Sequence, residues 1–288
     1  MCGRIMADSG RRPAMSKDRD HWREGFAADM PHLARRRVLV TGPAMGGAAL
    51  SLRAARSGAQ AVTGRRADGT VCVATPVETA GPFPADGTNV RAGQTVNILT
   101  ESGVIREDSC SSIGGLSPVA EGVPVSLEIA LVDVRRASAP LGGTAVHVRH
   151  CDAEGVHSIR AGQDRDDLRA VGISDDQGQV RFATVFPACY PGRWPHIPFE
   201  VFSGAEMAVS GKAALLISQF ALPEAACRAV YAANPIDAAS LRTIDDMSLA
   251  RDGSFRDASE EELMALVPVP DGDPAAGDRA AGRVGLVV

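Results

Sequence analysis

Side chains that can bind a metal or move a proton are concentrated between residues 151 and 202. This stretch contains His157, Tyr190, Arg193 and His196, and Tyr190 is one of only two tyrosines in the chain. A phenolate is a hard, anionic ligand that stabilises ferric iron, whereas a neutral imidazole suits several divalent metals. Each residue also has an ordinary alternative, since an exposed histidine, a turn tyrosine and a solvated loop arginine are all common.

Alternating apolar runs on both sides of this stretch predict the elements that position it. From about residue 75 to residue 202, short apolar runs are separated by Gly, Pro, Asp and Asn, which is typical of an all-β protein. The clearest strand is 123–134, in which Leu127, Ile129 and Leu131 alternate with Glu128 and Ala130. We predict an all-β fold, an antiparallel β-sandwich with minor helices. The other expected strands are 144–150, 179–185, 196–202, 212–220 and 283–288.

Two local signals refine this prediction. Pro198 has no backbone N–H, so it predicts an edge position or a bulge within strand 196–202. Helical patterns are confined to 223–231 and 259–266, where Ser259 is a plausible N-cap with Glu262 as its capping-box partner.

The chain resembles the intradiol ring-cleavage dioxygenases, ferric enzymes that split a catechol between its two hydroxylated carbons. The likeness begins at the segment Thr-Pro-Val-Glu-Thr-Ala-Gly-Pro-Phe of residues 75–83. It is most specific in the block 175–196, and it continues at Ser218-Gln219-Phe220, which is similar to the family's TQ strand. It covers roughly residues 72–288. The resemblance implies that iron, a small aromatic diol and O2 meet on a β-sandwich.

The resemblance also implies roles for single residues. In the family, two tyrosinates and two histidines of an HxH strand hold the iron. Tyr190 falls on the second tyrosine and His196 on the first histidine. Arg193 falls on the arginine that supports the polarised substrate, and Gln219 falls on the strand glutamine near the site.

Two ligand positions depart from the family pattern. His157 stands where the family has the tyrosine of Gly-x-Tyr, and Pro198, which has no donor atom, replaces the second histidine. The implied metal ligands are therefore His157, Tyr190 and His196. Three protein ligands match an open catalytic site better than a closed structural one. Tyr231 is the only other source of a tyrosinate. His147 and His150 are minor alternatives as replacement ligands.

Three functions stay open at this stage. The first is oxidative cleavage of a catechol-type dihydroxyaromatic by an iron dioxygenase with an altered ligand set. The second is a repurposed site, metal-free or bound to another metal, that performs a lyase, cyclase or hydrolase step on a polyhydroxylated aromatic. The third is a catalytically inactive binding module.

Composition excludes other classes of function. The net charge of −5 and the pI of about 5.7 argue against binding to a nucleic-acid backbone. Aromatic residues make up only 4% of the chain, too few for a stacking platform. No apolar run reaches the roughly 20 residues that a membrane-spanning helix needs.

The N-terminal region resembles an export signal. Arg35-Arg36-Arg37 precedes the apolar, small-residue run 38–52, and Ala59-Gln60-Ala61 offers a small-x-small cleavage site. We expect 1–33 to be a disordered tail, 34–61 a twin-arginine signal with its start at Met1 or Met30, and 62–288 the dioxygenase-like domain. Export by the twin-arginine route would place the domain in the cell envelope or outside the cell. Without a functional signal it would be cytoplasmic.

The six cysteines form no CxxC pair, which argues against a zinc ribbon, and export would permit one or two disulfides.

Overall fold

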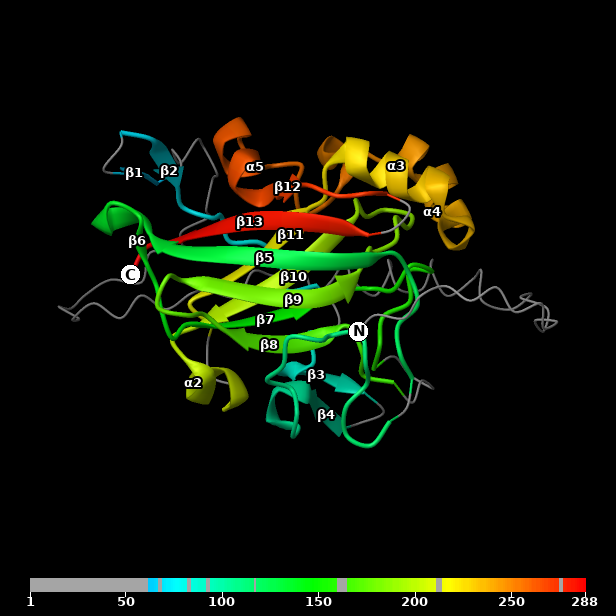
Figure 1. Cartoon of the computed structure of the whole chain (residues 1–288), viewed down its shortest axis with the longest axis horizontal. Helices are drawn as coiled ribbons and strands as arrows, with labels where there is room; N and C mark the ends of the chain where they lie inside the picture. Colours follow the sequence, from blue (N-terminus) through cyan, green and yellow to red (C-terminus); the bar gives the residue numbers. More distant parts are fainter. Residues whose placement is uncertain are drawn as a thin grey trace, which may run out of the picture.

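The structure, a computed structural model of the chain, consists mainly of strands joined by short helices (Figure 1). It describes residues 62–288 apart from 67–68, 82–83, 92–93, 117, 160–164, 211–213 and 275–276. The predicted all-β class with minor helices is therefore confirmed. The predicted tail and export signal lie outside the described residues.

Two sheets form the centre of the described domain. In the first the strand order is β11-β10-β7-β8, and in the second it is β12-β13-β5-β6, with β9 also paired to β5. The strands of the first sheet are β7 (Ala145–Arg149), β8 (Arg169–Ile173), β10 (His196–Phe202) and β11 (Leu216–Ala221). Those of the second are β5 (Pro124–Asp133), β6 (Ala139–Pro140), β9 (Gln179–Val185), β12 (Val269–Pro270) and β13 (Asp278–Leu286).

The pairing of β13 with β5 differs from the antiparallel prediction. These two strands run parallel from Asp278↔Val125 to Leu286↔Asp133, while every other pair of described strands is antiparallel. A parallel pair needs a long crossover connection. Here the chain leaves the sheets after β11 and returns through the helical segment between residues 224 and 266.

Residues of both sheets share one apolar core. On β5, Leu127, Ile129 and Leu131 are fully buried, as their alternation predicts. They belong to the same cluster as Phe182 of β9 and Phe199 of β10. Fully burying a side chain of this kind contributes about 1.5–3 kcal/mol, so the alternating strands supply much of the stabilisation that fixes the two sheets.

Strand β10 carries two different faces. Ile197, Phe199 and Val201 point into the shared core, so His196, Pro198 and Glu200 occupy the opposite face, which we call the outer face. The segment 76–81, together with Pro84, lies against the outer face and the β11 edge. Its backbone pairs with Ile217, and its carbonyl oxygens accept hydrogen bonds from Ser218, Gln219, Arg149 and Arg169.

The predicted edge at Pro198 is confirmed for the first part of β10, because residues 196–198 pair with β11 but not with β7, while no bulge occurs there. β10 lies between β11 and β7, and Pro198 pairs in unbroken register with Gln219. Leu222 N donates to Pro195 O, so hydrogen-bonded pairs with β11 fall on the odd-numbered positions of β10. The ring nitrogen of Pro198 therefore faces β7, whose pairing with β10 begins only at Phe199. The missing N–H of Pro198 therefore leaves the ladder with β11 intact and falls where the ladder with β7 stops.

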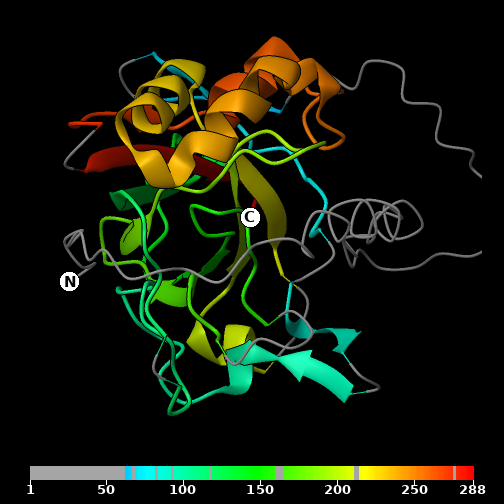
Figure 2. The same ribbon diagram turned by 90° about the vertical axis from the view of Figure 1, so that its right-hand side faces the viewer.

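The helices α3, α4 and α5 gather on one side of the sheets, whereas α2 lies on the opposite side (Figure 1). Figures 1 and 2 show α3, α4 and α5, coloured yellow to orange, beside β12 and β13, with the β3–β4 pair on the opposite side, near β8. α5 (Glu260–Leu266) starts with the predicted capping box of Ser259 and Glu262. No helix within the described residues is long and apolar enough to span a membrane. The remaining elements are β1 (Thr63–Arg65), β2 (Val71–Val73), β3 (Asp86–Arg91), β4 (Gln94–Asn97), η1 (Ile98–Thr100), η2 (Val134–Arg136), α2 (Ala205–Val209), α3 (Glu224–Ala233), η3 (Pro235–Asp237), α4 (Ala238–Thr243), η4 (Ile244–Asp246) and η5 (Leu249–Arg251).

Four of the six cysteines are buried thiols that form no disulfide. They lie in β2, in the loop after β7, in the segment before Tyr190 and in α3, and they are Cys72, Cys151, Cys189 and Cys227. Burial raises the pKa of Cys189 to about 12, so this thiol stays protonated at neutral pH. These four cysteines therefore act as small buried hydrophobic residues.

Asp237, at the end of η3, is buried, and neither carboxylate oxygen has a hydrogen-bond partner among the described residues. Burial raises its pKa from 3.8 to about 7. The folded state therefore holds this proton more tightly than the unfolded state, and stability falls as pH rises from about 4 to 7. We expect Asp237→Asn to match the wild type near pH 4.5 and to be more stable by about 1–3 kcal/mol at pH 8. Urea unfolding at both pH values measures this, and an advantage that does not grow with pH would contradict it.

Candidate metal centre

The structure brings His157, Tyr190 and His196 together. His157 Nε2 lies 3.5 Å from the Tyr190 hydroxyl oxygen, and the two rings meet edge to face with centroids 6.0 Å apart. The centroids of Tyr190 and His196 are 5.9 Å apart. Three segments supply these side chains: the loop after β7, the loop after β9 and the first residue of β10. The three side chains predicted from the sequence thus place two imidazoles around one phenol.

Hydrogen bonding fixes the orientation of the His196 ring. Its Nδ1 lies 2.6 Å from the carbonyl oxygen of Trp194. A carbonyl oxygen only accepts, so Nδ1 carries the proton and Nε2 keeps its lone pair. Burial, followed by the nearby Arg193, lowers the His196 pKa well below its usual value, so the ring is neutral at pH 7. A neutral imidazole with a fixed tautomer is the form that binds a metal.

Arg193 and Gln219 form one chain of contacts beside these rings. Arg193 Nη2 donates to Gln219 Oε1, and Gln219 Nε2 donates to the carbonyl oxygen of Thr79 at 2.6 Å. Arg193 also pairs through Nε with Asp252 Oδ2 at 3.1 Å. The predicted substrate arginine and strand glutamine are therefore partners, and both are tied to the segment that covers the outer face.

The loop that carries His157 is held at both ends. Asp152 Oδ1 accepts from the backbone N–H groups of Glu154 and Val156 at 3.0 and 2.8 Å. Next to His157, Ser158 Oγ donates to the carbonyl oxygen of Asp167 at 2.6 Å and accepts from Arg169 Nε at 3.1 Å. These bonds fix the backbone on each side of His157.

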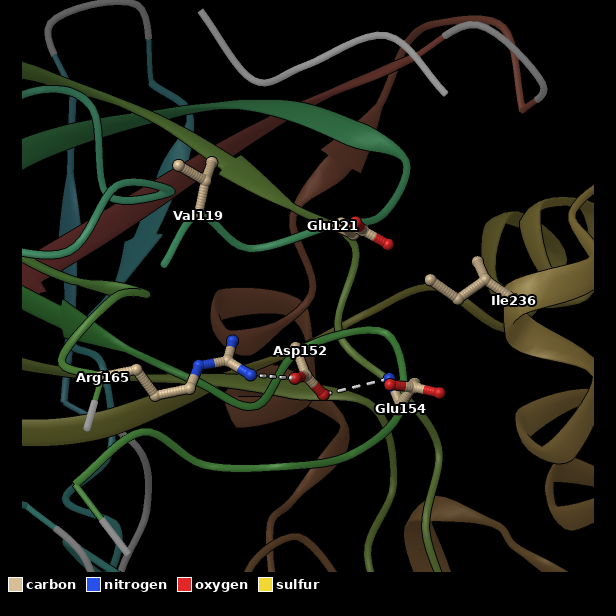
Figure 3. A pocket seen from close by; sticks show the side chains of 6 residues that line it. All are labelled: Val119, Glu121, Asp152, Glu154, Arg165 and Ile236. Atoms are coloured by element: carbon tan, nitrogen blue, oxygen red, sulfur yellow. Dashed lines mark hydrogen bonds and ion pairs between the residues drawn. The ribbon is translucent and has the colours of Figure 1, made fainter. Parts of the chain in front are cut away.

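The same loop borders a small pocket of about 150 Å³. Figure 3 shows Arg165 reaching toward Asp152, with which it forms an ion pair of 2.9 Å. The pocket is lined by Val119, Glu121, Asp152, Glu154, Arg165 and Ile236. None of the three clustered donors belongs to this lining, so the pocket is separate from the candidate centre.

The three alternative ligand candidates make contacts with other groups of the protein. His150 contacts the Cys151 carbonyl oxygen through Nδ1 and the Thr184 hydroxyl through Nε2, so both nitrogens are occupied. His147 is fully buried, with Nδ1 3.4 Å from Glu200 Oε2. Tyr231 donates its hydroxyl to the Pro187 carbonyl oxygen at 2.7 Å, and burial raises its pKa well above the usual value.

The donor set fits an open metal site of low charge. His196 Nε2, His157 and the Tyr190 phenol offer two imidazole nitrogens and one ionisable oxygen, whereas Pro198 offers no donor atom. Among the described residues, no three His, Cys, Asp or Glu side chains gather as a metal-binding group. A metal at this place would therefore need the phenol of Tyr190 as its third protein donor. Among the three donors, only this phenol can supply a negative charge.

Comparison with solved structures identifies the fold. An intradiol ring-cleavage dioxygenase from Tetranychus urticae superposes with a TM-score of 0.56 at 18% identity, over 75% of this chain and 95% of that one. A second dioxygenase structure matches with a TM-score of 0.56 and 18% identity, over 75% of this chain and 94% of the other. The chain has the fold of the intradiol ring-cleavage dioxygenases. Neither the family models nor the curated proteins that were compared gave a match.

Within this intradiol dioxygenase fold, sequence reasoning missed the residues that support the site. Asp252, Ser158 and Arg169 hold Arg193 and the His157 loop, yet no motif includes them. Asp252 is 59 positions from Arg193 along the chain, so only the folded structure joins the two. A local signal existed for Ser158 alone, because it directly follows His157.

Proposed function

We propose that the chain is a member of the intradiol ring-cleavage dioxygenase family that binds iron through His157, Tyr190 and His196. In this proposal it uses O2 to cleave a catechol-type dihydroxyaromatic on an intradiol-type β-sandwich. The observation that carries the proposal is the convergence of these three donors beside the Arg193–Gln219 pair. This convergence occurs on a fold shared with solved dioxygenases.

The side chains suit this chemistry. A bound iron would act as a Lewis acid and as a template for the diol and O2. His196 keeps a lone pair on Nε2 for the metal, because Trp194 fixes its tautomer. Arg193 presents a guanidinium held in place by Gln219 and Asp252. A fixed cation beside a deprotonated diol stabilises negative charge without reorganising during the reaction.

Oxygen uptake tests the proposed reaction. Protein reconstituted with ferric iron is incubated with catechol, a chlorocatechol and hydroxyquinol, and the products are identified by mass. We expect O2 consumption equal to the ring-opened product. Arg193→Met is expected to reduce kcat/KM about 10²–10³-fold, by analogy with the loss of one preorganised donor. Turnover of none of the three diols, or full activity in Arg193→Met, would contradict the proposal.

One observation favours a second candidate, the repurposed site. The 3.5 Å approach of His157 Nε2 to the Tyr190 hydroxyl pairs a base with an acid without any metal. A lyase, cyclase or hydrolase step on a polyhydroxylated aromatic would then need no iron. Product formation that persists in chelator-treated protein under argon would favour this candidate over the dioxygenase.

A further inference from the structure

We propose that Asp252 is a positioning residue of the candidate centre, because its carboxylate fixes the direction of Arg193 and the path of the loop before His196. The role of Arg193 toward substrate rests on the proposed function. The geometry rests on the described contacts alone. Asp252 follows the short helix η5 on the helical side of the domain.

The Asp252 carboxylate is fully buried and has three donors. Oδ2 accepts from Arg193 Nε at 3.1 Å and from the backbone N–H of Trp194 at 2.6 Å. Oδ1 accepts from the backbone N–H of Ser254 at 2.7 Å. Hydrogen bonds to an ionised carboxylate are about twice as strong as neutral ones, so this group firmly joins the segment after η5 to the loop before β10.

The consequence for Arg193 is a fixed orientation. Its planar guanidinium is held at Nε by Asp252 and at Nη2 by Gln219. Two contacts at different nitrogens of a rigid, planar guanidinium restrict its orientation. Without Asp252, the guanidinium of Arg193 would keep its hydrogen bond to Gln219 but lose the contact at Nε. It could then rotate about the bond to Gln219.

Asp252 also supports His196, through the backbone of Trp194. Asp252 binds the N–H of Trp194, and the carbonyl oxygen of Trp194 accepts from His196 Nδ1. The carboxylate is therefore one residue away from the group that sets the His196 tautomer. A single buried acid thus supports both the candidate substrate arginine and a candidate metal ligand.

A double-mutant cycle tests the coupling to Arg193. The probe is 4-nitrocatechol, titrated into the purified protein and followed by visible absorbance. We expect D252N to weaken binding at least about tenfold and R193M at least as much. The double variant should lose less affinity than the product of the two single losses, because part of the Asp252 effect acts through Arg193. Effects of D252N and R193M that multiply in the double variant would overturn the proposal.

The chain offers a matched control. Arg228 and Asp245 form a second arginine–carboxylate pair at 2.7 Å, but both side chains are exposed, at 43% and 69%. D245N removes the same charge from the surface and should leave the affinity for 4-nitrocatechol unchanged. A loss in D245N equal to that in D252N would show a general effect of charge and overturn the proposal.

A second readout needs no ligand. In a ¹⁵N-labelled sample, the Nε–H resonance of Arg193, assigned by its absence in R193K, should be protected from exchange at pH 8. D252N should lose this protection and D245N should keep it. If the Arg193 Nε–H is protected in a wild-type protein that binds no catechol, the positioning role of Asp252 stands and the proposed function is contradicted. An unprotected Arg193 resonance in the wild type would overturn the positioning role.

If D252N does not fold, R193K tests the same contact from the other end. Lysine keeps the charge but cannot reach Asp252 and Gln219 with a planar fork. We then expect R193K to bind 4-nitrocatechol at least about fivefold more weakly than the wild type. Wild-type affinity in R193K would show that the fixed orientation is irrelevant.

Discussion

Replacing Glu200 by glutamine is expected to lower the free energy of unfolding by about 3–5 kcal/mol. Glu200 lies on the outer face of β10 with 1% of its surface exposed, 3.2 Å from Arg149 Nη1 and 3.4 Å from His147 Nδ1. Arg169 is a further buried cation, and burial, then the neighbouring Arg149, lowers its pKa to about 9. Glutamine keeps the shape of Glu200 but leaves these buried arginines without its charge.

Glu128 provides the matched control for this prediction. It also pairs with two arginines, Arg181 and Arg279, each at 3.3 Å, but those arginines are more than half exposed. Exposed ion pairs contribute about 0–1 kcal/mol, so Glu128→Gln should change stability by less than about 1 kcal/mol. Urea unfolding at pH 7 measures both variants. Equal changes in the two would show that burial of Glu200 does not decide its contribution.

The double change His157→Tyr with Pro198→His is expected to increase the affinity for ferric iron at least about 100-fold. Tyrosine at 157 would stand next to the Tyr190 hydroxyl and add a second phenolate, which favours iron(III). Residues two apart on a strand point to the same face. A histidine at 198 would therefore project beside His196, opposite Gln219. Changes in groups that merely support metal ligands already alter affinity about 10–100-fold, so two new ligands should do more.

Iron titration with a visible spectrum measures this gain. The single variant Pro198→His should show an intermediate affinity, and a far-UV spectrum identical to the wild type confirms that each variant folds. Removing Pro198 should leave the ladder with β11 intact, because its nitrogen faces β7. A folded double variant that binds iron no better than the wild type would show that the centre has diverged beyond its ligands.

Alternation predicted the strands that pack into the shared core. The ranges 179–185 and 196–202 agree with β9 and β10 at both ends, and 123–134 differs from β5 by one residue at each end. These strands bury one or both faces, so their own residues carry the signal. The strand β8 carries no such signal, because it begins with Arg169. The Arg169 side chain can be buried because Ser158 Oγ and the Pro84 carbonyl oxygen accept hydrogen bonds from its guanidinium.

Long-range pairing decided what local patterns could not. The first half of β13 reads as a loop, with Asp278, Gly282 and two alanines, yet it is a strand because β5 supplies its partners. By contrast, the motif residues Tyr190, Arg193 and His196 lie within one short block of the sequence, so the sequence alone could identify them. Asp252 reaches Arg193 only through the fold, so its contact was invisible.

The most direct test of the metal centre is ferric iron bound by untagged protein, measured by metal analysis and visible absorption. The account predicts one iron per chain and a tyrosinate-to-iron band that disappears in Tyr190→Phe. The band should persist in Tyr231→Phe, because the Tyr231 hydroxyl is already bonded to the Pro187 carbonyl oxygen away from the centre. Protein that takes up no stoichiometric iron, or a band that survives in Tyr190→Phe, would contradict a centre built from His157, Tyr190 and His196.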